Sequence, residues 1–377
     1  MVYGMPNLPP NLKIALVHDY LREYGGAERV VEALHELFPQ APLYVSFVDQ
    51  DAMGQQWKKF ADWDIRQTWM SRVPLHRKLY SPLRLIAAKC FEDLDLHEFD
   101  VVISSSNAYF GKAVRVRPGA LHICYCHTPP RSLYGYSTMS DWKQNPITHF
   151  IGTIINHFCR VIDARVSKRV GIYVANSEEV KRRIAKFYRR DAVVIHPPVN
   201  VSTRVPLPTK ERLYYFYVNR LAFAKHPELA IQVCNELNLP LKVAGTGKAF
   251  AELKSLAGPS VEMLGEVSDE QLKELYAHAK ALLYPVEDED FGIVPVEAMS
   301  YGTPVIAHSS GGPKETIKDG VTGVFFDELN AEGLKKAIKL FEKEKISPIK
   351  IQEHAKQFSK STFQTKILEV VKKNLQK

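Results

Sequence analysis

The chain has 377 residues, more than one hydrophobic core usually serves, so we expect two domains of ordinary size. Its composition, 45% hydrophobic and 24% charged, is typical of a soluble globular protein, and no uninterrupted apolar run approaches the roughly 20 residues that span a bilayer. The formal net charge of +8 favours an anionic partner, but the basic residues show neither the aromatic interleaving of single-strand binders nor a DNA-reading motif, so we expect no contact with nucleic acid.

Two further features of the chain favour the cytoplasm. The first residues, MVYGMPNLPPNL, have neither a basic start nor an apolar stretch long enough for an export signal. The five cysteines are odd in number and scattered, which predicts reduced thiols, most of them packed as small hydrophobes. We therefore expect a cytoplasmic protein.

The first half of the chain, residues 11–196, alternates apolar runs with helical patterns. The run from Lys13 to Asp19 is followed by Gly25-Gly26 and then by an amphipathic stretch from Ala27 to Leu37, which predicts a strand, a glycine loop and a helix. Further strands are predicted at Pro42 to Val48, Asp100 to Ser104, Leu121 to Cys126 and Gly171 to Ala175. This alternation is typical of an α/β domain with a doubly wound parallel sheet.

A proline-rich segment interrupts this pattern, which then starts again. Residues 197–208, within HPPVNVSTRVPLP, predict a hinge. In residues 209–360 strands are predicted at Leu213 to Val218, Pro240 to Ala244, Val261 to Leu264, Ala281 to Tyr284 and Pro304 to Ala307. The remaining residues, 361–377, place apolar side chains at helical spacing, and we expect this helix to pack on the first domain.

The most informative stretch runs from Leu282 to Gly323. It contains a Glu, seven residues and a second Glu around a Phe-Gly step: Glu289, Phe291, Gly292 and Glu297. With IALVHDYL, GGAERVVEAL, HICYCHTPPR and VANSEEV in order before it, the chain resembles the retaining glycosyltransferases of family four, close to the bacterial mannosyltransferases of O-antigen assembly.

The resemblance implies the GT-B fold, in which two Rossmann-like domains face each other across a cleft. The first domain would bind the acceptor and the second a sugar-nucleotide donor, without a cofactor. It also implies transfer of a hexose with retention, most simply mannose from GDP-mannose, to a glycan or lipid-linked saccharide in surface polysaccharide synthesis. Donors with UDP, ADP or dTDP are alternatives, as are an epimerase or phosphorylase of the same fold and a catalytically silent nucleotide-binding module.

The two glutamates have distinct expected roles. A helix that begins near Ile293 places Glu297 one turn in, where a carboxylate can accept both hydroxyls of a ribose. The family places the loop carboxylate, here Glu289, on the donor sugar. Backbone N–H groups of Phe291, Gly292 and Ile293 at the helix N-terminus would contact sugar or phosphate.

Departure of a nucleoside diphosphate leaves negative charge on the β-phosphate, which a metal or fixed cations must stabilise. Arg220 and Lys225 follow the strand that ends at Val218, and their spacing resembles the phosphate-binding Arg and Lys of the family. The family usually has Gly before that Arg, where this sequence has Asn219.

Three glycine segments follow predicted strands and can approach a ligand closely. Gly25-Gly26 resembles the diphosphate or acceptor loop of the family, with a tight turn as the alternative. Gly245-Thr246-Gly247 is expected near the phosphates or base, and Gly265-Glu266-Val267 resembles the segment that borders the base.

Two further side chains follow strands of the first domain. His127 matches a His that touches the donor hexose in related enzymes, although a structural His is an equal alternative. Asp19 has a comparable position after the first strand and could reach the acceptor.

Two patterns invite a metal, and we expect none. Asp288 and Asp290 form a D-x-D that overlaps the Glu289 motif, next to cations that make a metal redundant. His122, Cys124 and Cys126 would share one face of a strand, but zinc sites seldom use this spacing, so a buried strand is favoured.

Two segments of the first domain mix bulky apolar and basic residues. These segments are Arg66 to Lys89 and Phe150 to Arg169. Such a surface could rest on anionic lipid, which would suit a lipid-linked acceptor and a peripheral position on the inner face of the membrane. Ordinary core-facing helices with solvated basic faces are the alternative.

Overall fold

The computed structural model describes residues 8–136, 138 and 145–375. They form two compact units: unit 1 contains the chain up to Pro198 together with the residues from Phe363 onward, and unit 2 is Val199–Thr362. Each unit contains one sheet in which all strand pairs are parallel. The predicted α/β fold with two doubly wound sheets is therefore confirmed.

Unit 1 contains a seven-stranded sheet in the order β3-β2-β1-β4-β5-β6-β7. Its strands are β1 (Ile14–His18), β2 (Leu43–Val45), β3 (Ile65–Gln67), β4 (Val101–Ser106), β5 (Leu121–Cys126), β6 (Ile172–Ala175) and β7 (Ala192–Val194). Its helices are α1 (Gly26–Leu37), α2 (Gln50–Met53), α3 (Arg84–Glu92), α4 (Pro146–Val166), α5 (Glu178–Tyr188) and most of α13 (Lys360–Leu375). The order reverses between β1 and β4, and ligands of such sheets bind outside the strand carboxyl ends at this switch point.

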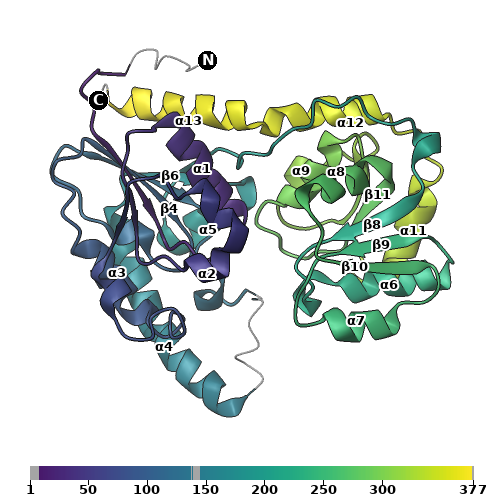
Figure 1. Cartoon of the computed structure of the whole chain (residues 1–377), viewed down its shortest axis with the longest axis horizontal. Helices are drawn as coiled ribbons and strands as arrows, with labels where there is room; N and C mark the ends of the chain where they lie inside the picture. Colours follow the sequence, from purple (N-terminus) through teal and green to yellow (C-terminus); the bar gives the residue numbers. More distant parts are fainter. Residues whose placement is uncertain (1–7, 137, 139–144, 376–377) are drawn as a thin grey trace. The chain divides into compact units, whose positions relative to one another are not determined.

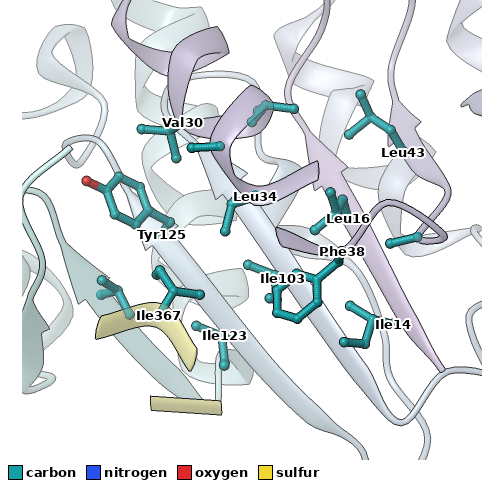
Figure 2. Packing of buried hydrophobic residues seen from close by; sticks show 14 of the residues in the cluster. Ile14, Leu16, Val30, Leu34, Phe38, Leu43, Ile103, Ile123, Tyr125 and Ile367 are labelled. Atoms are coloured by element: carbon teal, nitrogen blue, oxygen red, sulfur yellow. The ribbon is translucent and has the colours of Figure 1, made fainter. Parts of the chain in front are cut away.

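One face of the unit 1 sheet is covered by α1 and α13 (Figure 1). Val30 and Leu34 of α1 and Ile367 of α13 pack on strand residues such as Ile103 and Ile123 (Figure 2). The Gln364 side-chain amide also donates to the carbonyl of Ala33 in α1, at 3.1 Å. The end of the chain thus completes the core of unit 1, and α3 and α4 cover the other face.

Unit 2 contains a six-stranded sheet in the order β10-β9-β8-β11-β12-β13. Its strands are β8 (Tyr214–Val218), β9 (Leu241–Ala244), β10 (Val261–Gly265), β11 (Ala279–Tyr284), β12 (Val305–His308) and β13 (Gly323–Phe326). Its helices are α6 (Pro227–Glu236), α7 (Phe250–Leu256), α8 (Asp269–His278), α9 (Ile293–Ser300), α10 (Pro313–Thr316), α11 (Ala331–Phe341) and α12 (Pro348–Ala355). The switch point lies between β8 and β11.

Both faces of the unit 2 sheet are covered as well. Residues of α6, α7 and α11 pack on one face, and residues of α8, α9 and α12 pack on the other (Figure 1). The strands are therefore almost continuously apolar, which explains why they were recognisable in the sequence.

Three strands were not predicted: β3, β7 and β13. Each is three or four residues long and lies at an edge of its sheet. A short edge strand has little space for an apolar pattern, so it gives a weak signal. Because β3 was missed, the segment Arg66 to Lys89 was treated as one surface segment. In the structure it begins within β3 and ends within α3.

The proline-rich segment divides between the units. The chain passes from unit 1 to unit 2 between Pro198 and Val199, and back between Thr362 and Phe363. Val199 forms a bridge with Ser359, and the Gln352 side chain donates to the carbonyls of Ser202 and Arg204 at 3.2 and 2.8 Å. The residues after Val199 are therefore fixed to unit 2. Of the described helices, none is both long and apolar enough to cross a membrane.

Candidate functional site

The switch point of unit 2 brings together the loops that follow β8 and β11. Lys225 lies in the loop after β8, and its ammonium Nζ is 2.5 Å from Glu289 Oε2 in the loop after β11. The Tyr284 hydroxyl, at the end of β11, donates to the same oxygen at 2.8 Å. Both side chains of the ion pair are less than one-fifth exposed. The sequence selected Lys225 and Glu289 for separate reasons, and the fold makes them one unit.

The partners of this ion pair are themselves fixed. Burial, and then the charge of Glu289, raises the pKa of Tyr284 well above its usual value of 10, so its hydroxyl stays protonated and can donate. The buried Tyr217 hydroxyl of β8 donates to the carbonyl of Lys225 at 3.0 Å. Two tyrosines from neighbouring strands thus hold the acidic and the basic loop.

The backbone of the Glu289 loop is held by a glycine pair that the sequence analysis missed. The Gly312 N–H donates to the carbonyl of Glu289 at 2.8 Å. Gly311 has φ +61°, and a Cβ there would lie 2.3 Å from the Glu289 carbonyl oxygen. A Cβ on Gly312 would lie 2.4 Å from Phe291 Cα. The pair Gly311-Gly312 therefore permits a contact that no other residue type allows, and the Ser-Ser-Gly-Gly run was the available signal.

Helix α9 begins at Ile293, as predicted, and Gly292 precedes it with φ +86°. Proline at position 295 is compatible with the first turn, where its missing N–H would have no helical partner. Glu297 lies one turn in, and its Oε2 accepts a hydrogen bond from the Tyr276 hydroxyl at 3.0 Å. The side chain of Phe291 is buried and its ring centroid is 5.8 Å from that of Phe358, so only its backbone can face a ligand.

The glycines after β9 and β10 allow close approach between loops. Gly245 has φ +123° and its N–H donates to the carbonyl of Gly265 at 2.7 Å. A Cβ on Gly245 would lie 2.0 Å from the Asn219 carbonyl oxygen, and one on Gly247 would lie 2.2 Å from that of Leu221. These glycines hold the β8 loop in place, so their observed role is structural. Val267 packs at the border of the core formed with α8.

Arg220 is exposed and lies in the same β8 loop as Lys225. Its N–H donates to the side-chain oxygen of Asn219 at 3.0 Å. Asn219 therefore shapes the turn through a side-chain hydrogen bond at the position where the family usually has Gly.

In unit 1 a buried network of polar side chains begins at His18, the last residue of β1. Glu28 Oε2 accepts the Gly25 N–H at 2.8 Å, and Glu28 Oε1 lies 3.3 Å from His18 Nε2. Burial opposes charge on both groups, yet the His18–Glu28 interaction outweighs it, raising the pKa of His18 and lowering that of Glu28. Gly26 is the first residue of α1. The glycine loop is thus tied to a buried ion pair.

The same network of polar side chains extends to His127. Ser105 of β4 lies between the two histidines: its Oγ is 3.2 Å from His18 Nδ1 and 2.8 Å from His127 Nε2. Burial, with the neighbouring His18, lowers the pKa of His127 to about 4, so His127 is neutral near pH 7. If the Ser105 hydroxyl accepts from His18 and donates to His127, the proton of His127 is on Nδ1. Neither Ser105 nor Glu28 was selected from the sequence. Ser105 lies inside a buried strand, and Glu28 is one acidic residue in the first turn of an amphipathic helix, so neither carries a local signal.

Asp19 has a structural role. Its Oδ1 accepts from Ser106 Oγ and the Gly111 N–H at 3.2 and 2.7 Å, and its Oδ2 accepts from the N–H groups of Asn107 and Tyr109 at 2.8 and 2.9 Å. These four bonds occupy both buried oxygens, so the expectation that Asp19 reaches an acceptor is wrong.

The two metal-like patterns have other roles. Over the described ranges, no group of three or more His, Cys, Asp and Glu side chains could hold a metal ion. Asp288 adopts φ +53° and its N–H donates to Ser310 Oγ at 3.1 Å. β5 is a buried strand, as predicted, and His122 Nε2 is 2.9 Å from Ser104 Oγ.

Comparison with known proteins agrees with this architecture. Residues 24–203 match the model of Glycosyltransferase Family 4, and residues 202–361 match that of Glycosyl transferases group 1. The chain is 25% identical to the alpha-1,3/1,6-mannosyltransferase ALG2 of Candida glabrata, over 81% of this chain and 78% of that protein.

Solved structures show the same fold. The lipopolysaccharide outer core galactosyltransferase WaaB aligns with a TM-score of 0.68 and 18% identity, over 96% of this chain and 99% of that chain. Anabaena Alr3699/HepE in complex with UDP and glucose aligns with the same TM-score and coverage, at 17% identity. With both family models matched in order along its two units, the chain belongs to the GT-B glycosyltransferases of the family-four type.

Proposed function

We propose that this protein transfers a hexose, with retention, from a nucleoside diphosphate sugar to a glycan or lipid-linked saccharide. The observation that supports this most is the Lys225–Glu289 ion pair at the switch point of unit 2, one loop before Glu297. A cation for the diphosphate and a carboxylate for the sugar stand next to each other there, as a sugar nucleotide requires.

Each group then has a role. Glu297 accepts the ribose hydroxyls, and the α9 N-terminus, with the N–H groups of Gly292 and Ile293, meets the sugar or phosphate. Lys225 and Arg220 neutralise the β-phosphate as it leaves, so the reaction needs no metal. Glu289 orients the donor sugar, held by Tyr284.

The reaction proceeds by attack on one face of the sugar. The bond from the anomeric carbon to the β-phosphate oxygen breaks, the acceptor oxygen bonds to that carbon on the same face, and the acceptor proton passes to a β-phosphate oxygen. His127 contributes as a neutral Nδ1–H donor to a sugar hydroxyl. It does not act as a general base, because Ser105 occupies its other nitrogen.

The donor is GDP-mannose. The named mannosyltransferase relative supports mannose, whereas a solved neighbour in complex with UDP-glucose favours UDP as the second candidate. A thermal-shift panel of GDP, UDP, ADP and dTDP distinguishes them, because a ligand that binds only the native state raises Tm. We expect the largest shift with GDP, and a larger shift with UDP would reassign the donor.

Release of nucleoside diphosphate tests the enzymatic function itself. The purified chain should slowly release GDP from GDP-mannose, and Glu297→Ala and Arg220→Ala should abolish this release while the protein stays folded. Lys254→Ala on α7, an exposed basic side chain of the same unit, serves as the matched control. A chain that binds a nucleoside diphosphate but releases none from any of the four sugar-nucleotide classes would be a binding module instead.

Unit 1 also has a surface suited to a bilayer. Six apolar side chains of α4 are between 44% and 70% exposed and recur at helical spacing: Ile147, Phe150, Ile151, Ile154, Phe158 and Val161. The residues of α4 that face the core are others, among them Cys159, Asp163 and Val166. The core-facing alternative is therefore excluded for these six side chains.

Charge favours lipid as the occupant of this surface. α3 packs against α4, and the segment Arg66 to Lys89 carries six Lys or Arg and no Asp or Glu. Three of these cations pair with carboxylates just outside the segment, Arg66 with Asp64, Arg77 with Asp49 and Asp51, and Lys89 with Asp93. Apolar side chains next to a segment rich in basic residues match the interface of an anionic membrane. Peripheral contact with the inner membrane face would give access to a lipid-linked acceptor of surface polysaccharide synthesis.

Liposome flotation tests this surface. Wild-type protein should float with vesicles that contain phosphatidylglycerol and less with purely zwitterionic ones, and Phe150→Ser/Phe158→Ser should stay at the bottom. Leu256→Ser/Leu340→Ser removes two similarly exposed apolar side chains from unit 2 and should float like wild type. Unchanged flotation of the Phe double variant would exclude α4 as the contact.

A further inference from the structure

Aromatic rings gather at the carboxyl edge of the unit 1 sheet, next to its switch point. Tyr20, directly after β1, stacks on Phe47 with ring centroids 5.4 Å apart and an interplanar angle of 15°. The rings of Tyr80 and Tyr109 meet Tyr20 edge-on at 6.0 and 5.4 Å. Phe47 and Tyr109 are buried, whereas Tyr20 and Tyr80 are partly exposed and form the outer side of the cluster.

Two arginines lie against this cluster. The Arg22 guanidinium is 4.3 Å from the centroid of the Tyr80 ring. Arg22 and Arg77 both pair with Asp49 at 3.7 Å, and Arg77 also pairs with the exposed Asp51 at 3.3 Å. Because each guanidinium has five N–H donors, one carboxylate on Arg22 and two on Arg77 leave donor capacity for an oxygen-rich ligand.

The cluster occupies the place where an acceptor-binding group is expected. Asp19 is the residue between β1 and Tyr20, and its two oxygens are filled by four donors from residues 106–111. The groups that follow it, Tyr20 and Arg22, are the next side chains at this edge. They present a ring and a cation, and the segment Arg66 to Lys89, which contains Arg77 and Tyr80, has no Asp or Glu of its own. The carboxylates at this edge are those of Asp49 and Asp51, which pair with the two arginines.

We propose that the aromatic–arginine cluster, defined as Tyr20, Arg22, Arg77 and Tyr80, is an acceptor subsite that binds a phosphate or diphosphate ester. Arg22 and Arg77 bind the phosphate oxygens, and the rings pack on the apolar face of the attached sugar or chain. The identification of this ligand as the acceptor rests on the proposed glycosyl transfer. The binding of a phosphate ester by the cluster does not depend on that proposal.

A phosphate ester has two possible sources here. The first is the acceptor itself, in which a phosphate joins the glycan to its lipid; the second is a phospholipid head group. The position of the cluster at the strand carboxyl ends favours the acceptor, because ligands of doubly wound sheets bind at that edge. The test must therefore separate a soluble ester from a bilayer.

Calorimetric titration of farnesyl diphosphate, a soluble prenyl diphosphate, is the direct test. Wild-type protein should bind it about a hundredfold more tightly than farnesol, and Arg22→Gln/Arg77→Gln should remove this preference, about tenfold for each arginine. Binding of farnesol should not change. Lys13→Gln/Arg117→Gln is the matched control, because these two cations form ion pairs with Glu98 and Asp100 near the opposite ends of the strands.

The outcomes are distinct. Equal affinity for farnesyl diphosphate and farnesol in wild type, or equal loss in both double variants, would overturn the subsite. So would an arginine variant that binds farnesyl diphosphate normally but no longer floats with anionic vesicles, since this assigns the arginines to head groups. Release of GDP from GDP-mannose without acceptor should be unchanged in the arginine variant; its absence from every preparation would count against the transferase and not against the subsite.

Discussion

At the scale of single residues, the ion pair of Lys225 and Glu289 is the centre of the proposed donor site. The sequence could place both residues after strands, because parallel strands end at one edge of a sheet. It could not show that side chains 64 residues apart meet at 2.5 Å, nor that Tyr284 holds the carboxylate. Those contacts depend on which strands are neighbours in the sheet, and a local sequence pattern does not reveal the order of the strands.

Loss of Lys225 should affect catalysis more than donor binding. We expect Lys225→Met to lower kcat for transfer by about 10²- to 10³-fold, because the charge on the leaving diphosphate then loses a fixed cation. The measurement is steady-state release of nucleoside diphosphate, with Lys254→Met as the surface control. An unchanged kcat would mean that Lys225 serves only to hold Glu289.

Ser105 should act through His127. In Ser105→Ala, His127 loses the partner of Nε2, so the preference for the Nδ1–H tautomer should weaken, and kcat/KM should fall by about tenfold. Ser105→Thr keeps the hydroxyl and should restore both properties. ¹⁵N shifts of the imidazole measure the tautomer directly, and a tautomer that is the same in Ser105→Ala and wild type would contradict this role.

At the scale of elements, the loops of unit 2 depend on backbone contacts that only glycine allows. The elements themselves were largely predictable, since strands covered on both faces are long apolar runs; the missed β3, β7 and β13 are short edge strands. The loop contacts were not predictable, because the requirement for glycine at Gly311 comes from the Glu289 carbonyl in a different loop.

Substitution of Gly311 and of Gly320 separates the effect of a blocked loop contact from that of backbone strain alone. Both have positive φ, +61° and +68°, but a Cβ on Gly311 would lie 2.3 Å from the Glu289 oxygen, whereas one on Gly320 meets nothing within 4 Å. Gly320→Ala should cost about 1 kcal/mol of stability from backbone strain alone and leave activity intact. Gly311→Ala should displace the Glu289 loop and lower kcat/KM by more than about tenfold. Equal activity of the two variants would contradict a positioning role for Gly311.

At the scale of the whole molecule, each unit has its own parallel sheet and its own hydrophobic core. The sequence predicted the two sheets and the return of the C-terminal helix, because hydrophobic periodicity and the restart of the strand pattern are visible along the chain. It left open which apolar residues face outward. α4 shows why: its exposed stripe is apolar, whereas two of its four buried residues are the polar Asn156 and Asp163, so the apolar pattern alone does not distinguish core from surface.

The stability of unit 1 should depend on pH through its buried histidines. Burial lowers the pKa of His122 to about 4, below the unfolded value of 6.5. The unfolded chain therefore binds more protons between these values, and stability falls as the pH falls through that window. Burial also lowers the pKa of His127 to about 4, so His127 contributes to the loss of stability in the same direction.

His122→Gln should thus reduce the loss of stability between pH 7 and pH 5 by roughly 2 kcal/mol. All four tryptophans lie in the part of the sequence that belongs to unit 1, so denaturant unfolding followed by tryptophan fluorescence reports on this unit. A variant with the same pH dependence as wild type would show that His122 is not buried as a neutral group.

The most direct test of the central claim is calorimetric titration of GDP into the full chain, with UDP as the second ligand. We expect one site per chain, an affinity lowered about a hundredfold in Glu297→Ala because the ribose contacts are lost, and an unchanged affinity in Arg22→Gln/Arg77→Gln of unit 1. Binding that is unaffected by Glu297→Ala, or no binding of any nucleoside diphosphate, would contradict a donor site at the unit 2 switch point.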